Sequence, residues 1–139
     1  MKKRTPVSSI MTSKMVTVNT NDDLRKVSDL MKKHHIRHIP VVSGDKLAGV
    51  ISQTDVMRLS FGNLFDGQTE ADEAIFDMLK IEQVMVHHPK TVSPNDTIRD
   101  VATYLAQAEF HALPVVDDNK LVGIVTTTDV IKYLIDQYD

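Results

Sequence analysis

The amino-acid sequence contains the same pattern twice, at an offset of 74 residues, so that Gly49 matches Gly123. No gap is needed between residues 7 and 57, and most of the differences exchange one apolar residue for another. The identities include Thr17-Val18 with Thr91-Val92, Pro40-Val41-Val42 with Pro114-Val115-Val116, and Thr54-Asp55-Val56 with Thr128-Asp129-Val130. A doubled pattern of this kind predicts two equivalent structural units, and any pocket that they form should occur twice.

The length of 139 residues corresponds to a single domain. Each half is close to the lower size limit for a separate hydrophobic core, so we expect the halves to pack on each other and fold as one body. We therefore divide this single module into a first motif over residues 7–60, a connecting segment over 61–80 and a second motif over 81–139.

Charge and composition exclude several classes of function. A net charge of −3 gives no general attraction for nucleic acid, which we do not expect as a partner. The absence of cysteine excludes disulfides and thiol catalysis. No apolar stretch has the length of a membrane span or the form of a secretory signal, so we expect a cytoplasmic protein with no membrane contact.

Each repeat shows the signals of a strand, a helix, a hairpin and a second helix. The first helix is predicted to start with Thr20 as its cap, and Ser93 with Pro94 stands at the same place in the second repeat. Two short apolar runs around the turn at 43–45 predict the hairpin, and a further helix is predicted to begin at Val56.

Two further details predict how these elements pack. Leu24, Val27 and Met31 lie at helical spacing, which predicts that they face the core. Pro40 has no N–H group to donate, so we expect it at the start of its strand or on a sheet edge.

The connecting segment has no counterpart elsewhere in the chain. Its residues predict an amphipathic helix with an acidic outer face, and the apolar stripe consists of Ala71, Ala74, Ile75, Met78 and Leu79. The favoured interpretation is a linker helix that lies on the core, and the alternative is a docking surface for a partner or a second subunit.

The strongest candidate site lies where the second strand of each hairpin runs into a helix. There a Gly and two apolar residues precede Ser52-x-x-Asp55 in one repeat and Thr126-x-x-Asp129 in the other. A helix start gathers unpaired N–H groups that suit phosphate, and a carboxylate on the first turn can accept hydrogen bonds from sugar hydroxyls. The same spacing is also a helix-capping pattern. Its repetition in both copies favours a binding role.

With these motifs in the order strand–helix–strand–strand–helix, the chain resembles a pair of cystathionine β-synthase (CBS) motifs, often called a Bateman module. The resemblance covers nearly the whole chain. It implies an α/β fold in which two tandem β-α-β-β-α motifs pack with pseudo-twofold symmetry. It also implies clefts between the motifs that bind adenosyl ligands such as AMP, ADP, ATP, S-adenosylmethionine or a dinucleotide.

The resemblance further implies roles for individual residues. Asp55 and Asp129 would hold the ribose hydroxyls, and Ser52 and Thr126 would touch phosphate. The other ligand-binding residues that it implies are Thr54, Thr128, Thr17, Thr91, Ile36, Arg37, His38, Ile39, Pro40, Phe110, His111, Ala112, Leu113 and Pro114.

The family often places basic residues just before the apolar-Pro pair, where they reach phosphates. The first motif has Arg37-His38 at this place and the second has His111-Ala112. The second site is therefore expected to be poorer by one cation.

Catalysis and metal binding find no support in the sequence. The histidines do not stand at metal-ligand spacings with acidic residues, so we expect no metal site. Asp55 and Asp129 are equivalent by repeat and so are not a differentiated acid and base.

We therefore interpret the chain as a stand-alone regulatory module and not an enzyme. It would form a homodimer, require no cofactor, bind AMP, ADP, ATP or S-adenosylmethionine as a regulatory ligand, and signal to a separate effector protein. The alternative is a ligand-free structural dimerisation module.

Overall fold

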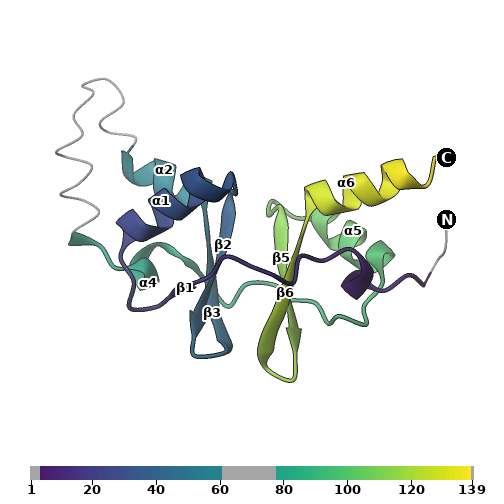
Figure 1. Ribbon diagram of the computed structural model, residues 1–139, viewed down its shortest axis with the longest axis horizontal. Helices are drawn as coiled ribbons and strands as arrows, with labels where there is room; N and C mark the ends of the chain where they lie inside the picture. Colours follow the sequence, from purple (N-terminus) through teal and green to yellow (C-terminus); the bar gives the residue numbers. More distant parts are fainter. Residues whose placement is uncertain (1–3, 61–77, 139) are drawn as a thin grey trace. The chain divides into compact units, whose positions relative to one another are not determined.

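The computed structural model describes residues 4–60 and 78–138 (Figure 1). Its elements in chain order are η1 (Val7–Ser9), β1 (Val18–Asn19), α1 (Leu24–His34), β2 (His38–Ser43), β3 (Lys46–Ser52), α2 (Gln53–Ser60), α4 (Ile81–Val84), β4 (Val86–His87), α5 (Ile98–Gln107), β5 (Ala112–Asp117), β6 (Lys120–Thr126) and α6 (Thr127–Asp136). The predicted mixed α/β order is confirmed. Most of the helix predicted in the connecting segment falls on residues 61–77, outside the described residues.

The chain divides into two compact units, one formed by Val16–His88 and the other by Met1–Met15 together with Pro89–Asp139. The Val16–His88 unit has a sheet of order β1-β2-β3-β4, in which only β1 and β2 run parallel. In the other unit the β5–β6 hairpin is flanked by single bridges, a parallel one from Val92 and an antiparallel one from Thr12. The first strand predicted for the second repeat is thus reduced to one bridge at Val92.

Each unit has its own apolar core. The predicted stripe of α1 is confirmed, since Leu24, Val27 and Met31 are buried against the sheet of the Val16–His88 unit. In the other unit Val101 of α5 is fully buried among Leu113, Val115 and Val125 of the hairpin. Burial of each such side chain contributes roughly 1.5–3 kcal/mol, which is the main stabilising term for units of this size.

The segment that leads into each repeat packs with the hairpin of the other repeat. Val7 is fully buried in the core that contains α5, and Ile81 is fully buried in the core that contains α1. Thr12 exchanges two backbone hydrogen bonds with Ile124, at 2.9 and 3.0 Å. The compact units therefore differ from the sequence repeats by an exchange of these leading segments.

Glycine makes this exchange sterically possible. A Cβ on Gly123 would lie 2.6 Å from Met11 Sδ, and a Cβ on Gly49 would lie 2.7 Å from Met85 Sδ and 2.6 Å from the carbonyl oxygen of Val86. The leading segments therefore lie against the backbone of the hairpins, where no side chain fits.

Pro40 does not lie where the sequence predicted it, and that prediction is wrong. It is the third residue of β2, pairs with Val50 of β3, and lies in a strand that has neighbours on both sides. The pairing of β1 with β2 begins only at Val41, so the missing N–H faces no strand at the level of Pro40. In the other unit, the Val92 N–H donates to the carbonyl oxygen of Pro114 at 3.0 Å, and this contact needs no N–H group on the proline.

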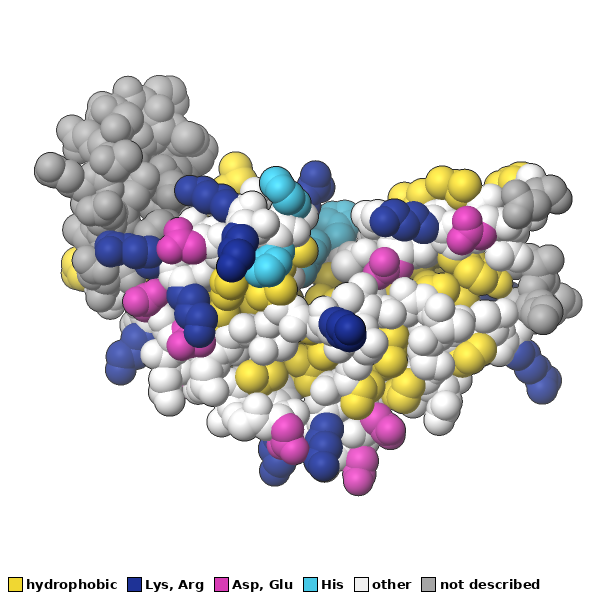
Figure 2. Space-filling view, viewed as in Figure 1, with side chains coloured by type: hydrophobic (Ala, Val, Ile, Leu, Met, Phe, Trp, Pro, Cys, Tyr) yellow, Lys and Arg dark blue, Asp and Glu magenta, His cyan; other side chains and the backbone are white. Residues whose placement is uncertain are grey.

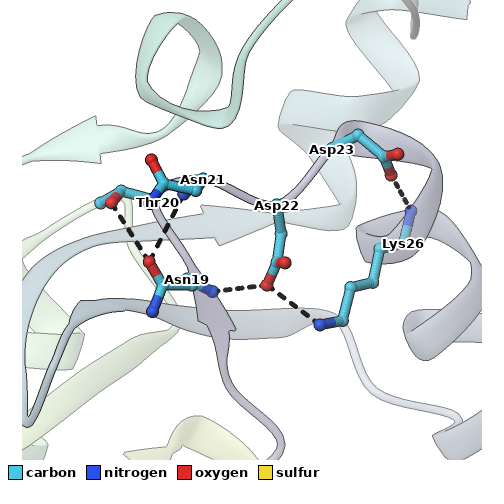
Figure 3. Close-up of polar contacts among 6 residues, drawn as sticks. All are labelled: Asn19, Thr20, Asn21, Asp22, Asp23 and Lys26. Carbon is cyan, nitrogen blue, oxygen red and sulfur yellow. Dashed lines mark hydrogen bonds and ion pairs between the residues drawn. The ribbon is translucent and has the colours of Figure 1, made fainter.

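The predicted cap of the first helix is also wrong. Helix α1 begins at Leu24, and its cap is Asp23, whose Oδ1 accepts from the N–H of Lys26 at 2.9 Å. Thr20 lies in the preceding turn (Figure 3). That turn is closed by Asp22, which accepts from the Asn19 N–H at 2.7 Å and from the Lys26 ammonium at 3.0 Å. Side-chain hydrogen bonds to the local backbone delay the helix start to Leu24.

The second repeat behaves in the same way. Helix α5 is capped by Thr97 and not by Ser93, which lies in a turn where its N–H donates to Asp96 Oδ2 at 2.8 Å. Pro94 therefore precedes the helix. The final helices instead start earlier than predicted, since α2 begins at Gln53 and not at Val56.

We predict that Asp22→Asn destabilises the chain in a pH-dependent way. The hydrogen bond from the Asn19 N–H, and to a smaller extent Lys26, lowers the pKa of Asp22. A lowered pKa stabilises the folded state above the pKa of the unfolded carboxyl, near 3.9, and this stabilisation is lost as pH falls through the lower folded-state pKa. Urea denaturation should show a loss of about 1 kcal/mol at neutral pH and a smaller loss in acid.

The matched control is Asp29→Asn on the exposed side of the same helix, which should change the free energy of unfolding little at either pH. An equal loss for Asp22→Asn at both pH values would contradict the assigned role.

We also predict unequal costs for two alanine substitutions at equivalent positions. In Gly123→Ala the closest contact is a flexible methionine side chain, and the backbone oxygen of Thr12 is 3.2 Å away, whereas in Gly49→Ala the backbone oxygen of Val86 is only 2.6 Å from the new Cβ. Overpacking costs typically 1–3 kcal/mol, and the rigid contact should put Gly49→Ala at the upper end. Urea denaturation of both variants should show this difference in the free energy of unfolding. In a Met11→Ala background, Gly123→Ala should cost less than it does in the wild type. Equal losses and no relief would argue against this packing.

Candidate functional site

The start of α2 uses all but one of its unpaired N–H groups. The Ser52 N–H donates to Asp55 Oδ2 at 2.9 Å, and the Asp55 N–H donates back to Ser52 Oγ at 3.2 Å. The Gln53 N–H donates to the Arg37 carbonyl at 2.7 Å. A helix leaves four such groups unpaired. The remaining N–H, that of Thr54, has no partner among the described residues.

The start of α6 repeats this arrangement. Thr126 and Asp129 form the same reciprocal pair, at 2.9 and 3.2 Å. The Thr127 N–H donates to the His111 carbonyl at 3.0 Å. Within the described part of the chain, the Thr128 N–H is again left over.

Both aspartates therefore complete a capping box with the Ser or Thr that caps the helix, and each keeps part of its carboxylate for another partner. In each unit Oδ2 accepts from both the backbone and the hydroxyl of the capping Ser or Thr. Oδ1 of Asp55 lies 3.7 Å from Arg58 Nη1. Oδ1 of Asp129 meets no partner in residues 4–60 and 78–138. The capping geometry thus leaves one oxygen in each unit that can accept a hydrogen bond from a ligand hydroxyl.

Two of the four predicted ligand-binding hydroxyl groups at the helix starts already form hydrogen bonds among the described residues, and the other two do not. Those of Ser52 and Thr126 already donate to the aspartates, at 2.9 and 3.1 Å. Those of Thr54 and Thr128 are on exposed residues and have no partner in the described chain. Each free hydroxyl sits on the residue whose N–H is also free, so two donors for an anion stand side by side.

The structure brings the other predicted residues of each repeat to the same place. The hairpin register sets His38 opposite Ser52 and Ala112 opposite Thr126. Thr17 directly precedes β1, which pairs with β2 from Val18 onward. In the other unit the residue after Thr91 bonds to the Pro114 carbonyl. All predicted ligand-binding residues of one repeat therefore belong to one compact unit.

Burial separates the residues that can offer a side chain from those that can offer only backbone. Ile39 and Leu113 are fully buried in their cores, and Ala112 is 8% exposed. Pro40 and Pro114 are also buried. Their roles in ligand binding stay predictions, and they are limited to main-chain atoms in this conformation. Besides Thr54 and Thr128, the exposed predicted ligand-binding residues are Arg37, Phe110 and His111.

Arg58 is a residue of this site that the sequence analysis missed. Its guanidinium is the charged group beside Asp55. The spacing of three residues on one helix, which favours an ion pair, would have been the signal.

In the described residues, no group of three or more His, Cys, Asp or Glu side chains could hold a metal ion. Among the described helices, none combines the length and apolarity that a membrane span needs.

Comparison with known proteins identifies two matched regions. The family model of the CBS domain matches residues 7–62 and 81–136. The chain is 32% identical over 123 residues to the CBS domain-containing protein YhcV of Bacillus subtilis, and the match covers 88% of this chain and 81% of YhcV. Several other relatives are longer, and the chain covers only 21% to 46% of their length.

Two solved structures are similar over nearly the whole chain. CBSX2 of Arabidopsis thaliana, determined in complex with AMP, is 25% identical with a TM-score of 0.81, and the match covers 97% of this chain and 99% of that one. The CBS domain pair of MJ0100, in complex with 5′-methylthioadenosine and S-adenosyl-L-methionine, is 26% identical with a TM-score of 0.73 and coverages of 94% and 99%.

Proposed function

The chain belongs to the CBS domain family, and from this premise we propose that each of its units binds an adenosyl ligand at the capped helix start. The observation that supports this most is the coincidence, on one helical turn in each unit, of three groups that the cap does not use, although Oδ1 of Asp55 also lies 3.7 Å from Arg58 Nη1. These are an N–H, the hydroxyl of the same threonine, and the second oxygen of the capping aspartate. The similarity to proteins solved with AMP and with S-adenosyl-L-methionine points to the same ligand class.

The proposed binding mode assigns each free group to a part of the ligand. The N–H and hydroxyl of Thr54 or Thr128 donate to an anionic oxygen, aided by the positive end of the helix dipole. Oδ1 of Asp55 or Asp129 accepts from a ribose hydroxyl, while Oδ2 keeps the helix capped. The backbone beside Ile36 and Phe110, with Thr17 and Thr91, is left to contact the base.

This function is regulatory and not enzymatic. Every group assigned above would hold the ligand, and no chemical step is assigned to any of them. We propose that the ligand-bound state is passed to a separate effector protein in the cytoplasm, where adenine nucleotides and S-adenosylmethionine are metabolites. A ligand-free structural dimerisation module remains the second candidate.

An exposed apolar stripe on α6 supports dimerisation in both cases. Ile131, Leu134 and Ile135 are 51%, 42% and 61% exposed and lie at helical spacing, and Tyr138, two residues beyond the end of α6, is 81% exposed. An unpartnered apolar face of this kind marks a protein interface. We propose that it pairs two copies of the chain.

Ligand binding should raise the melting temperature. A ligand at a hundredfold excess over its Kd stabilises the folded state by about 2.7 kcal/mol, which corresponds to a shift of a few degrees. Scanning fluorimetry with AMP, ADP, ATP, S-adenosylmethionine and NAD tests this. If millimolar concentrations of all five leave the melting temperature unchanged, the ligand-free module is the correct function.

Asp55→Asn and Asp129→Asn should each weaken binding by roughly tenfold in calorimetry, because charge-assisted hydrogen bonds to ribose contribute about 1.5–3 kcal/mol. The matched control is Asp100→Asn, since Asp100 forms the same reciprocal cap with Thr97 at the start of α5. It should cost similar stability and leave affinity unchanged. Equal affinities for all three variants would show that the two site aspartates serve only as caps.

Dimerisation can be tested independently of ligand. Light scattering at micromolar concentration should give a mass about twice 15.6 kDa for the wild type. Leu134→Glu or Ile135→Glu should reduce it to a single chain, because a charge cannot be buried without a partner. Gln107→Glu, at the exposed last residue of α5, is the control and should stay dimeric. A wild-type mass of one chain at every concentration would refute the proposed interface.

A further inference from the structure

The two capped helix starts share their backbone geometry but differ in the charges around them. In the Val16–His88 unit, Arg37 and Arg58 accompany the single carboxylate of Asp55, and Arg58 already forms an ion pair with it. The residue two positions before Arg37 is His35, which is also exposed.

At the equivalent positions of the other unit, negatively charged side chains outnumber the lysine and arginine side chains. The second repeat has Asp129 and, where the first repeat has His35, the exposed carboxylate of Glu109. His111 replaces Arg37, and Lys132 replaces Arg58 without forming an ion pair to Asp129 in the described chain. One lysine thus accompanies two carboxylates. Figure 2 shows Lys and Arg side chains gathered over the α1 region of the Val16–His88 unit, with Asp and Glu side chains among them.

The second unit carries an aromatic side chain where the first has none. Phe110 is 38% exposed, whereas its equivalent Ile36 is half-buried and packs on the core. An exposed ring offers a nucleobase a stacking surface, and that attraction does not depend on phosphate. The carboxylates of this unit would repel phosphate but tolerate or attract a cationic group.

Resting on the proposed function, we propose that the two sites take different classes of adenosyl ligand. The Val16–His88 site takes a ligand with a 5′-phosphate chain. The Pro89–Asp139 site takes one with an uncharged or cationic 5′ substituent. Arg37 and Glu109 are the residues that set this difference.

The experiment first isolates each site. Asp129→Asn weakens the second site and leaves the Val16–His88 site for titration, and Asp55→Asn does the reverse. Each variant is titrated by calorimetry with AMP, ATP and 5′-methylthioadenosine. With Asp129→Asn, AMP should bind at least tenfold more tightly than 5′-methylthioadenosine, and ATP more tightly still. With Asp55→Asn, 5′-methylthioadenosine should bind at least as tightly as AMP, and ATP should bind least well.

Charge reversal then tests the two assigned residues. In the Asp129→Asn background, Arg37→Glu should weaken AMP by at least tenfold and 5′-methylthioadenosine by less than twofold. In the Asp55→Asn background, Glu109→Lys should strengthen AMP and leave 5′-methylthioadenosine unchanged. Lys46→Glu, at the tip of the β2–β3 hairpin, reverses one charge of the same unit away from the site and should change neither affinity.

The outcomes separate this proposal from the function on which it rests. Binding of both ligands with the same AMP to 5′-methylthioadenosine ratio at the two sites would overturn the division of ligands and keep the adenosyl-binding function. If Arg37→Glu weakened the affinity for AMP and for 5′-methylthioadenosine equally, the division of ligands would also be overturned and the adenosyl-binding function kept. No binding of any ligand to the wild type would overturn the function itself.

Discussion

The hydrogen bond from the first helical N–H to the carbonyl before the hairpin is the interaction on which each candidate site depends. It joins Gln53 to Arg37 in one unit and Thr127 to His111 in the other. It extends the pairing of His38 with Ser52 and of Ala112 with Thr126 by one further bond. With it, the last helix starts beside the loop that carries the charged residues. The bond is between backbone atoms, so the side chains of that loop can differ while the geometry stays the same.

Capping and ligand binding were posed as alternatives for the Ser/Thr-x-x-Asp pattern, and the structure shows that the first does not exclude the second. The cap consumes Oδ2 of the aspartate and the hydroxyl of Ser52 or Thr126. It leaves Oδ1, together with the N–H and hydroxyl of the threonine before the aspartate. A cap that fixes the carboxylate also reduces the entropy lost when a ligand binds to its second oxygen.

The sequence was sufficient to predict the element order, the buried stripe of α1 and the pattern at the helix start, because periodicity and spacing encode these directly. It failed at the starts of α1 and α5, where the turns closed by Asp22 and Asp96 compete with an earlier helix. The position of Pro40 depended on where a neighbouring strand begins, which no local pattern reports. The exchanged leading segments were also invisible, because repeat similarity reveals equivalent segments but not the hairpin against which each one packs.

The exchange of leading segments makes each compact unit depend on residues from both repeats. In the unit formed by Met1–Met15 and Pro89–Asp139, Thr12 pairs with Ile124, which lies two residues before the capping Thr126. The contact is close, because a Cβ on Gly123 would lie only 2.6 Å from Met11 Sδ. Close packing of this kind transmits displacement instead of absorbing it. The strand that leads into the capped turn of this unit is therefore held in part by residues that precede the first repeat, far away in the sequence.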